Sequence, residues 1–133
     1  GLLVANNIFH ILGTSVNVLD DQDKRKDKTV ARISRSFAQN NVYSSATVLP
    51  GNIPFKDTNM IVGDVQFSKP GGINAADYIP KNLKIIKDQG IEIPMLEGDT
   101  DGLKIGLKVS KDFFGNPIVG KPDIGAIEPE NRS

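Results

Sequence analysis

Three carboxylates close to the C-terminal end come nearest to a catalytic arrangement: Asp112, Asp123 and Glu128. Two carboxyl groups placed around a glycosidic bond can supply the acid and the base or nucleophile of a glycosidase. Asp123, however, stands shortly before Gly125, in a stretch typical of a tight turn, where aspartate more often accepts backbone N–H hydrogen bonds. We therefore expect these carboxylates to hold local structure, and we predict no catalytic residue.

A second acidic group, Glu97, Asp99 and Asp101 in the segment EGDTDG, places oxygen ligands at alternate positions. Hard oxygen ligands of this kind hold Ca²⁺ in other loops. The loop that ends in a bidentate glutamate is missing, because the chain passes at once into an alternating stretch from Leu103. An acidic turn is the favoured interpretation, a Ca²⁺ site is the alternative, and no other cofactor is expected.

Arg32, Arg35 and Lys28 form a basic strip on one predicted strand. The planar fork of arginine pairs well with carboxylates, including those of acidic sugars. We interpret the strip first as solvated strand residues and second as saccharide contacts at Arg32 and Arg35. His10 is the only histidine, and without a nucleophile-elbow motif it gives no Ser-His-Asp triad. We expect His10 to face outward or to close a row of stacked side chains.

The composition narrows the class of protein. The chain has 133 residues, and its 16 Lys and Arg balance 16 Asp and Glu, so bulk charge gives no support for a nucleic-acid partner. No apolar run approaches the ~20 residues of a membrane helix, and the absence of cysteine excludes disulfides and thiolate metal sites. The 13 Gly and 8 Pro with few aromatics predict one turn-rich, all-β domain over residues 1–133.

The local patterns predict short strands joined by polar turns. Residues 20–28 (DDQDKRKDK) are too charged to be buried and predict an exposed loop. Residues 60–67 and 91–95 are strand-like, and Leu103 to Val109 alternate so regularly that they predict a half-buried strand. Between Leu83 and Gly90 there is room for one short helix.

A repeat is the most informative feature of the sequence. Asn6-Asn7-Ile8-Phe9 recurs later in the chain as Asn40-Asn41-Val42-Tyr43. Such self-similarity is typical of solenoids, in which equivalent positions stack above one another. We expect the asparagines to form amide ladders and the apolar and aromatic residues to stack inward, with the charged 20–28 segment as an insertion.

Four short segments follow the repeat along the chain. They are Gly63–Phe67 (GDVQF), Leu83–Gly90, Asp112–Pro117 (DFFGNP) and Asp123–Glu128 (DIGAIE). Together with the repeat, this order resembles the C-terminal end of secreted right-handed parallel β-helix proteins, the pectate-lyase-like superfamily. The resemblance covers nearly the whole chain. Val65, Ile127 and residues 82–84 depart from the usual residues.

The resemblance implies an all-β fold of right-handed parallel β-helix coils with an irregular C-terminal cap. Residues 1–67 would form the last coils and residues 68–133 the segment that closes the end, with 118–127 lying across it. The expected apolar cover is Phe113, Phe114, Ile118, Val119, Ile124 and Ile127. The expected structural motif residues are Asn6, Asn7, Asn40, Asn41, Asp112, Gly115, Asp123, Gly125 and Glu128.

Proteins of this superfamily bind, cleave or epimerise polysaccharides. The resemblance thus implies a bacterial, extracellular or cell-surface protein, with acidic or neutral polysaccharide and preceding coils as partners. A noncatalytic end module is the first hypothesis. The alternatives are a polysaccharide lyase or glycoside hydrolase whose groove reaches Arg32 or Arg35, and a cell-surface adhesin or stalk module.

Overall fold

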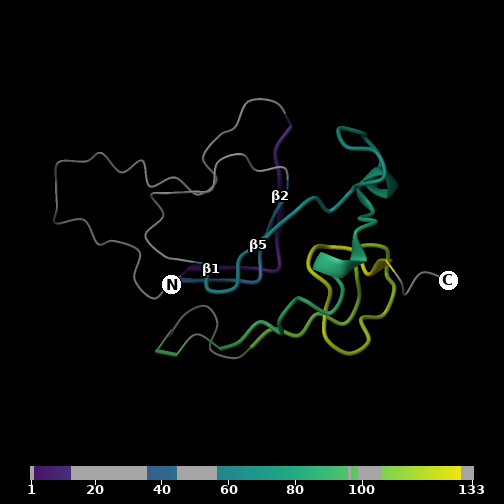
Figure 1. The fold of residues 1–133 in the computed structure, drawn as a ribbon. Coiled ribbons are helices and arrows are strands. Elements are labelled where there is room, and N and C mark those ends of the chain that lie inside the picture. Colours follow the sequence, from purple (N-terminus) through teal and green to yellow (C-terminus); the bar gives the residue numbers. More distant parts are fainter. Residues whose placement is uncertain (1, 13–35, 45–56, 96, 99–105, 130–133) are drawn as a thin grey trace, which may run out of the picture.

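The computed structural model describes residues 2–12, 36–44, 57–95, 97–98 and 106–129. This part of the chain is mainly β, with five short strands and two 3₁₀ helices (Figure 1). The strands are β1 (Leu2–Ala5), β2 (Ile8–His10), β3 (Ser36–Gln39), β4 (Val42–Ser44) and β5 (Ile61–Val62). The helices are η1 (Ala75–Tyr78) and η2 (Leu83–Ile85). No helix in these ranges is long and apolar enough to cross a bilayer.

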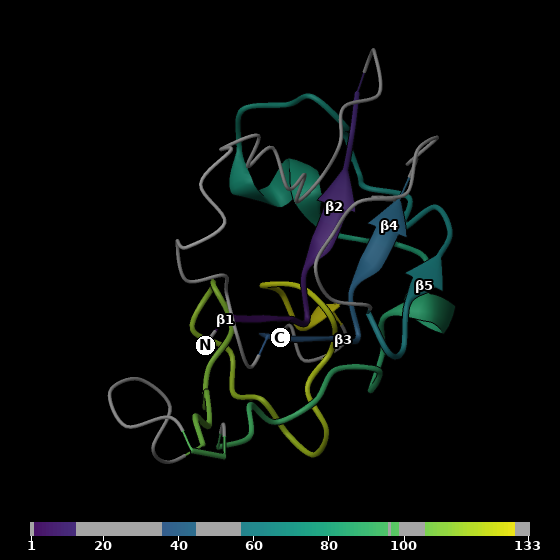
Figure 2. The ribbon, with the colours of Figure 1, turned by 90° about the vertical axis from the view of Figure 1, so that its left-hand side faces the viewer.

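The strands form two parallel sheets, β1-β3 and β2-β4-β5. Figure 2 shows β2, β4 and β5 side by side. Ile8 is the strand partner of Val42, so the two copies of the sequence repeat are stacked in the structure. Val42 in turn faces Ile61, which follows it after a shorter stretch of chain. We call residues 2–12, 36–44 and 57–63 the first, second and third layers.

The connection between the first and second layers is therefore longer than the connection between the second and third. The charged 20–28 segment falls in that longer connection, at the place where an insertion was expected. The segment itself, like Arg32 and Arg35, lies outside the described residues.

Equivalent asparagines turn the chain from one sheet into the other. Asn6 lies between β1 and β2 with φ 58°, and Asn40 lies between β3 and β4 with φ 56°. Asparagine tolerates this left-handed conformation better than most residues with a side chain. Both layers therefore bend at the same point (Figure 1). As a result, β3 stays in register with β1 before the bend, and β4 stays in register with β2 after it.

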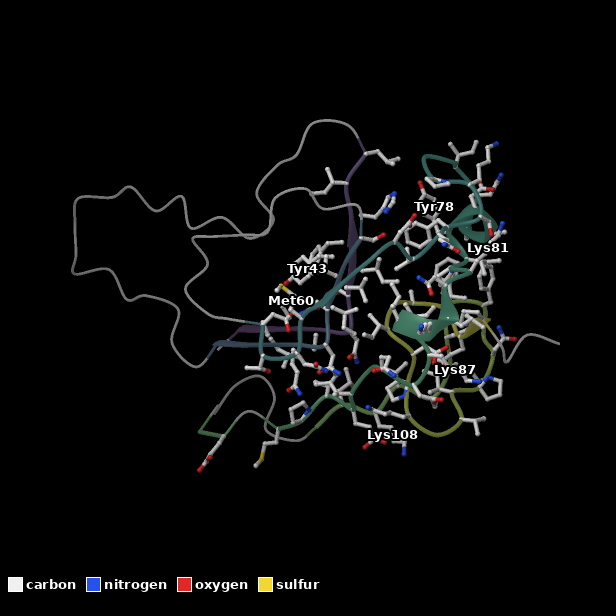
Figure 3. All side chains as sticks on the ribbon, in the orientation of Figure 1. Tyr43, Met60, Tyr78, Lys81, Lys87 and Lys108 are labelled. Carbon is white, nitrogen blue, oxygen red and sulfur yellow. The ribbon has the colours of Figure 1, made fainter. Side chains whose placement is uncertain are left out.

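The core lies on one face of the β2-β4-β5 sheet. Val42 is fully buried there with Val65, Ile86 and Ile124, and Ile8 and Ile61 flank it. The aromatic residues of the repeat lie on the opposite face, where the rings of Phe9 and Tyr43 stack with centroids 5.4 Å apart. Figure 3 shows Tyr43 and Tyr78 on opposite sides of the sheet. The expected stacking is thus present for both kinds of residue, but the aliphatic and aromatic rows lie on opposite faces, because successive side chains of a strand point to opposite faces.

The half-buried strand predicted over residues 103–109 is wrong in its described part, residues 106–109. Leu107 and Val109 are each 54% exposed, and Leu107 makes only an isolated antiparallel bridge to Ile93. Alternation records which side chains could share a face, but burial also needs a second layer over that face. The strand expected over 91–95 is likewise reduced to that bridge at Ile93.

The short helix expected between Leu83 and Gly90 is present as η2. The helix η1 was not expected from the sequence. Its first turn is closed by Asp77, whose Oδ2 accepts a hydrogen bond from the backbone N–H of Asn74 at 3.0 Å. An acidic residue three positions after an asparagine is the signal that could have located it.

Candidate functional site

A ladder of side-chain amides joins the first and second layers. The Oδ1 of Asn41 accepts hydrogen bonds from the side-chain Nδ2 and the backbone N–H of Asn7, both at 3.0 Å. The Nδ2 of Asn41 donates to the carbonyl of Val4 at 3.0 Å and to Asp57 Oδ2 at 2.8 Å. Asn41 is fully buried, and every polar atom of its side chain is used. The ladder expected from the repeat is present at Asn7 and Asn41, which we call the ladder asparagines. The other two asparagines of the repeat, Asn6 and Asn40, bond to later segments of the chain instead of to each other.

The ladder ends in the third layer. The pairing of Val42 with Ile61 aligns Asn41 with Met60, whose side chain has no amide group to continue the ladder. Asp57 takes the last amide hydrogen bond instead, and it also accepts the hydroxyl of Tyr43 at 3.3 Å. Burial, reinforced by the negative charge of Asp57, raises the pKa of Tyr43 to about 12, so this hydroxyl stays a donor.

Sequence reasoning missed Asp57. The structure pairs Asp57 with Ala38, and Ile61 with Val42. The signal for Asp57 was its separation from Ile61 along the sequence, which equals the separation of Ala38 from Val42. Without the register of the third layer, however, neither pair of residues could be aligned.

The asparagines at the two bends, Asn6 and Asn40, hold a later segment of the chain against the strands. Asn6 donates from Nδ2 to the carbonyl of Ile91 at 2.7 Å and accepts the N–H of the same residue at 2.9 Å. Asn40 donates to the carbonyl of Gln89 at 2.6 Å. Asn6 thus acts as a backbone-like partner, because an amide carries both an acceptor and donors, whereas Asn40 uses only its donor.

The three carboxylates considered for catalysis all accept backbone N–H groups. Asp112 accepts from Phe114, Asn116 and Glu128 at 2.8 to 3.1 Å. Asp123 Oδ1 accepts from Asp88 at 2.7 Å, and Glu128 Oε1 accepts from Asp123 at 2.9 Å. Asp123 and Glu128 are only 6% and 4% exposed. These carboxylates therefore stabilise local turns and hold segments that are distant in the sequence against one another.

These contacts move two pKa values in opposite directions. Burial raises the pKa of Glu128, and the negative charges of Asp123, Asp112 and Asp88 add to that effect against one backbone hydrogen bond from Asp123. For Asp112, burial would raise the pKa, but the hydrogen bonds from Glu128, Asn116 and Phe114 together lower it. Glu128 is thus the carboxylate for which ionisation opposes folding.

Glu128→Gln is expected to flatten the dependence of stability on pH. The raised pKa of Glu128 means that its stabilising contribution is complete below the ordinary value of 4.5 and is lost as pH rises through the folded-state pKa. Glutamine keeps the oxygen that accepts the Asp123 N–H but cannot ionise. Urea unfolding between about pH 4.5 and 7 should show a smaller loss of unfolding free energy in the variant than in the unchanged chain.

Asp112 supplies the control for that measurement. Because its pKa is lowered, its contribution is present above the ordinary value of 3.8 and is lost as pH falls below it. Asp112→Asn should therefore leave most of the slope between about pH 4.5 and 7 in place, with a smaller reduction than Glu128→Gln gives, because the charge of Asp112 is one minor cause of the raised pKa of Glu128. An unchanged slope in the Glu128→Gln variant would contradict the assignment of that slope to Glu128.

Part of the expected apolar cover is in place and part is not. Ile124 is fully buried and Ile127 is 8% exposed, but Phe113 and Val119 are 66% and 68% exposed. The ring of Phe113 packs edge to face on Phe114, with centroids 5.2 Å apart, instead of on the core. The turns that carry these residues point them away from the core.

Two glycines adopt backbone conformations that the segments 112–117 and 123–128 require. Gly115 and Gly125 have φ values of +84° and +107°, which residues with a side chain rarely adopt. At Gly125 a Cβ atom would also lie 2.8 Å from Cδ1 of Ile8. The motif 123–128 therefore passes directly against the first layer, and the Gly125 N–H donates to the carbonyl of Asn6 at 2.9 Å.

A hollow of about 410 Å³ lies where this motif meets the first layer. Its lining is mostly apolar and comes from Asn6, Asn7, Ile8, Phe67, Tyr78, Pro80, Ile124, Gly125, Ala126 and Ile127. On this side of β2 no strand of the described residues is paired with it. The hollow and the free edge of β2 form the candidate binding site.

Of the remaining predicted residues that the structure describes, neither His10 nor Glu97 lines this hollow. His10 Nδ1 lies 3.2 Å from Ser44 Oγ, and the ring packs edge-on against Phe67, so it closes a side-chain row as expected. Glu97 is exposed. Lys28, Arg32, Arg35, Asp99 and Asp101 lie outside the described residues, so the saccharide and Ca²⁺ assignments stay predictions. Within the described ranges, no three acidic or histidine side chains are grouped to hold a metal ion.

Comparisons with protein-family models, with curated proteins and with solved structures find no match to this chain.

Proposed function

We propose that this chain forms the last coils and the closing cap of a right-handed parallel β-helix in a bacterial, extracellular or cell-surface protein that handles polysaccharide. The module itself is noncatalytic. It ends the solenoid and seals its apolar interior, while preceding coils carry the polysaccharide site.

The stacking of the repeat is the observation that carries this proposal. Two bends with left-handed asparagines lie in parallel register and share a buried amide ladder. The third layer follows in the same register, with Ile61 beside Val42. Parallel layers that repeat one bend are what a solenoid requires.

The role of a cap is supported by the way the later segments pack. Ile86 and Ile124 complete the core beside Val42, and the backbone N–H of Ile124 donates to the carbonyl of Ile86 at 3.0 Å. The ladder stops at Met60 and Asp57 in the third layer. A solenoid end needs such closure, because an open end exposes strand edges and a slice of core.

The polysaccharide part of the proposal derives from the resemblance of the terminal motifs. The noncatalytic part is supported by the engagement of Asp112, Asp123 and Glu128 with backbone N–H groups. For the alternatives of a lyase, a hydrolase or an adhesin stalk, no contact in the described residues gives specific support.

Incubation with polygalacturonate, alginate and a neutral glucan tests the noncatalytic assignment. The chain is expected to release no unsaturated sugar, followed by ultraviolet absorbance, and no new reducing ends, with and without Ca²⁺. An authentic lyase provides the positive control. Product that disappears in an Arg32→Ala, Arg35→Ala double variant would establish the lyase alternative in its place.

A further inference from the structure

The free edge of the first layer carries an unused acceptor. In the second layer, Asn41 Oδ1 receives two N–H groups from the layer before it, both from Asn7. Asn7 occupies the same position one layer earlier. Its side chain is exposed, and no N–H group of the described residues donates to its Oδ1.

The same edge also carries a backbone donor for which the described residues supply no acceptor. The N–H of Val42 donates to the carbonyl of Asn7 at 2.8 Å, and that of Ile61 donates to the carbonyl of Asn41 at 3.0 Å. Ile8 holds the equivalent position in the first layer. Because residues of a parallel strand bond alternately to either side, the N–H of Ile8 points away from β4, toward the free edge.

The apolar row that runs through the layers is also incomplete at this edge. Val42, which has a neighbour on both sides, is fully buried, whereas Ile8 is only half-buried. The hollow of about 410 Å³ opens beside Ile8 and is lined by Phe67, Ile124 and Ile127. One more β-branched side chain above Ile8 would extend the row into the hollow.

From these three features we infer that the edge of β2 recognises an extended, parallel strand bearing an asparagine followed by a β-branched residue. The asparagine donates its side-chain and backbone N–H groups to Asn7 Oδ1, and its carbonyl accepts the N–H of Ile8. The β-branched side chain fills the hollow. The inference rests on the proposed function in that such a strand belongs to a preceding coil of the parent protein.

A second copy of the chain fits this edge less well. A copy stacked in the same direction would present its third layer, and there Met60 stands at the ladder position. Methionine has no side-chain N–H group for Asn7 Oδ1. The chemistry of the edge thus favours a strand with an asparagine at that point.

Duplication of residues 2–35 ahead of Leu2 tests the inference. The duplicated Asn7 then precedes Asn7 by the offset that separates Asn7 from Asn41. Hydrogen exchange of the Ile8 amide, measured by NMR, is expected to slow by roughly two- to tenfold, since one added hydrogen bond of ordinary net strength changes an opening equilibrium by about this factor. The Val42 amide, already bonded to Asn7, serves as the internal control for folding.

The decisive variant is Asn7→Asp in the duplicated layer alone. Aspartate has the same shape but no side-chain N–H, and its charge faces Asn7 Oδ1, so most of the protection of Ile8 should disappear. Equal protection by the two forms would overturn the amide chemistry, and no protection by either would overturn strand binding.

Association of the unextended chain in sedimentation, with a protected Ile8 amide, would overturn the inference by assigning the edge to a second copy. Polysaccharide cleavage in the earlier assay would refute the noncatalytic function without changing these results.

Discussion

A chain that ends at Lys111 is expected to lose cooperative unfolding and to self-associate. Truncation removes Ile124 from the core, and it removes the Asp123 carboxylate that accepts the N–H of Asp88. It also uncovers the carbonyl of Asn6, which now accepts the N–H of Gly125. Exposed strand edges and apolar surface promote association. Urea unfolding and sedimentation of the truncated chain measure both effects.

A point substitution gives the graded form of the same prediction. Ile124→Ala should lower the unfolding free energy by about 2–4 kcal/mol, because truncation of a fully buried isoleucine leaves a cavity. Ile73→Ala is the matched control, since Ile73 is 97% exposed, and it should change stability by no more than about 0.5 kcal/mol. A truncated chain that stays monomeric and as stable as the full chain would refute the capping role.

Asn41→Leu is expected to destabilise the chain by about 3 kcal/mol. Leucine has the branched shape of asparagine but removes one or more hydrogen bonds from each of three groups: the carbonyl of Val4, the N–H groups of Asn7 and the carboxylate of Asp57. A buried polar group without a hydrogen bond costs about 1–3 kcal/mol, and three such groups are affected, some of them reached by water. The midpoint of urea unfolding reports the loss.

Asn59→Leu provides the comparison for that variant. Asn59 stands in the third layer, is exposed, and contributes only its backbone N–H to Asp57. Its substitution should therefore change stability by less than about 0.5 kcal/mol. Asn41→Leu as mild as this control would mean that the ladder contributes no net stability. A double-mutant cycle with Asn7→Leu then isolates the amide pair itself, because the two side chains are in direct contact.

The repeat in the sequence was sufficient to predict the stacking of the first two layers. Asn7 and Asn41 could be recognised as a pair because a ladder needs identical side chains at equivalent points, and such identity is visible in one dimension. The third layer could not be predicted in this way. Its Asp57 and Met60 replace the asparagine pattern, and it follows the second layer after a shorter interval, so no similarity marks it.

The alternation over residues 103–109 predicted burial that the described residues do not have. The pattern shows only that Leu107 and Val109 can share a face. Whether that face is covered depends on segments distant in the chain, and among the described residues only a bridge to Ile93 lies beside it. The same limit explains Phe113, which is apolar in sequence but 66% exposed in the structure.

The sequence by itself determined a turn-rich β chain and the equivalence of the two asparagine pairs, because these follow from residue types and from spacing along the chain. The structure decided that Asn7 and Asn41 form the ladder while Asn6 and Asn40 turn the chain. Tertiary structure alone decided which backbone N–H groups Asp123 and Glu128 accept, and that Ile124 is buried in the core while Phe113 stays exposed. It also decided that, among the described residues, the edge of β2 beside Asn7 is left open. Such features depend on contacts between distant segments, and the free energy of those contacts is set by burial and geometry that no local pattern contains.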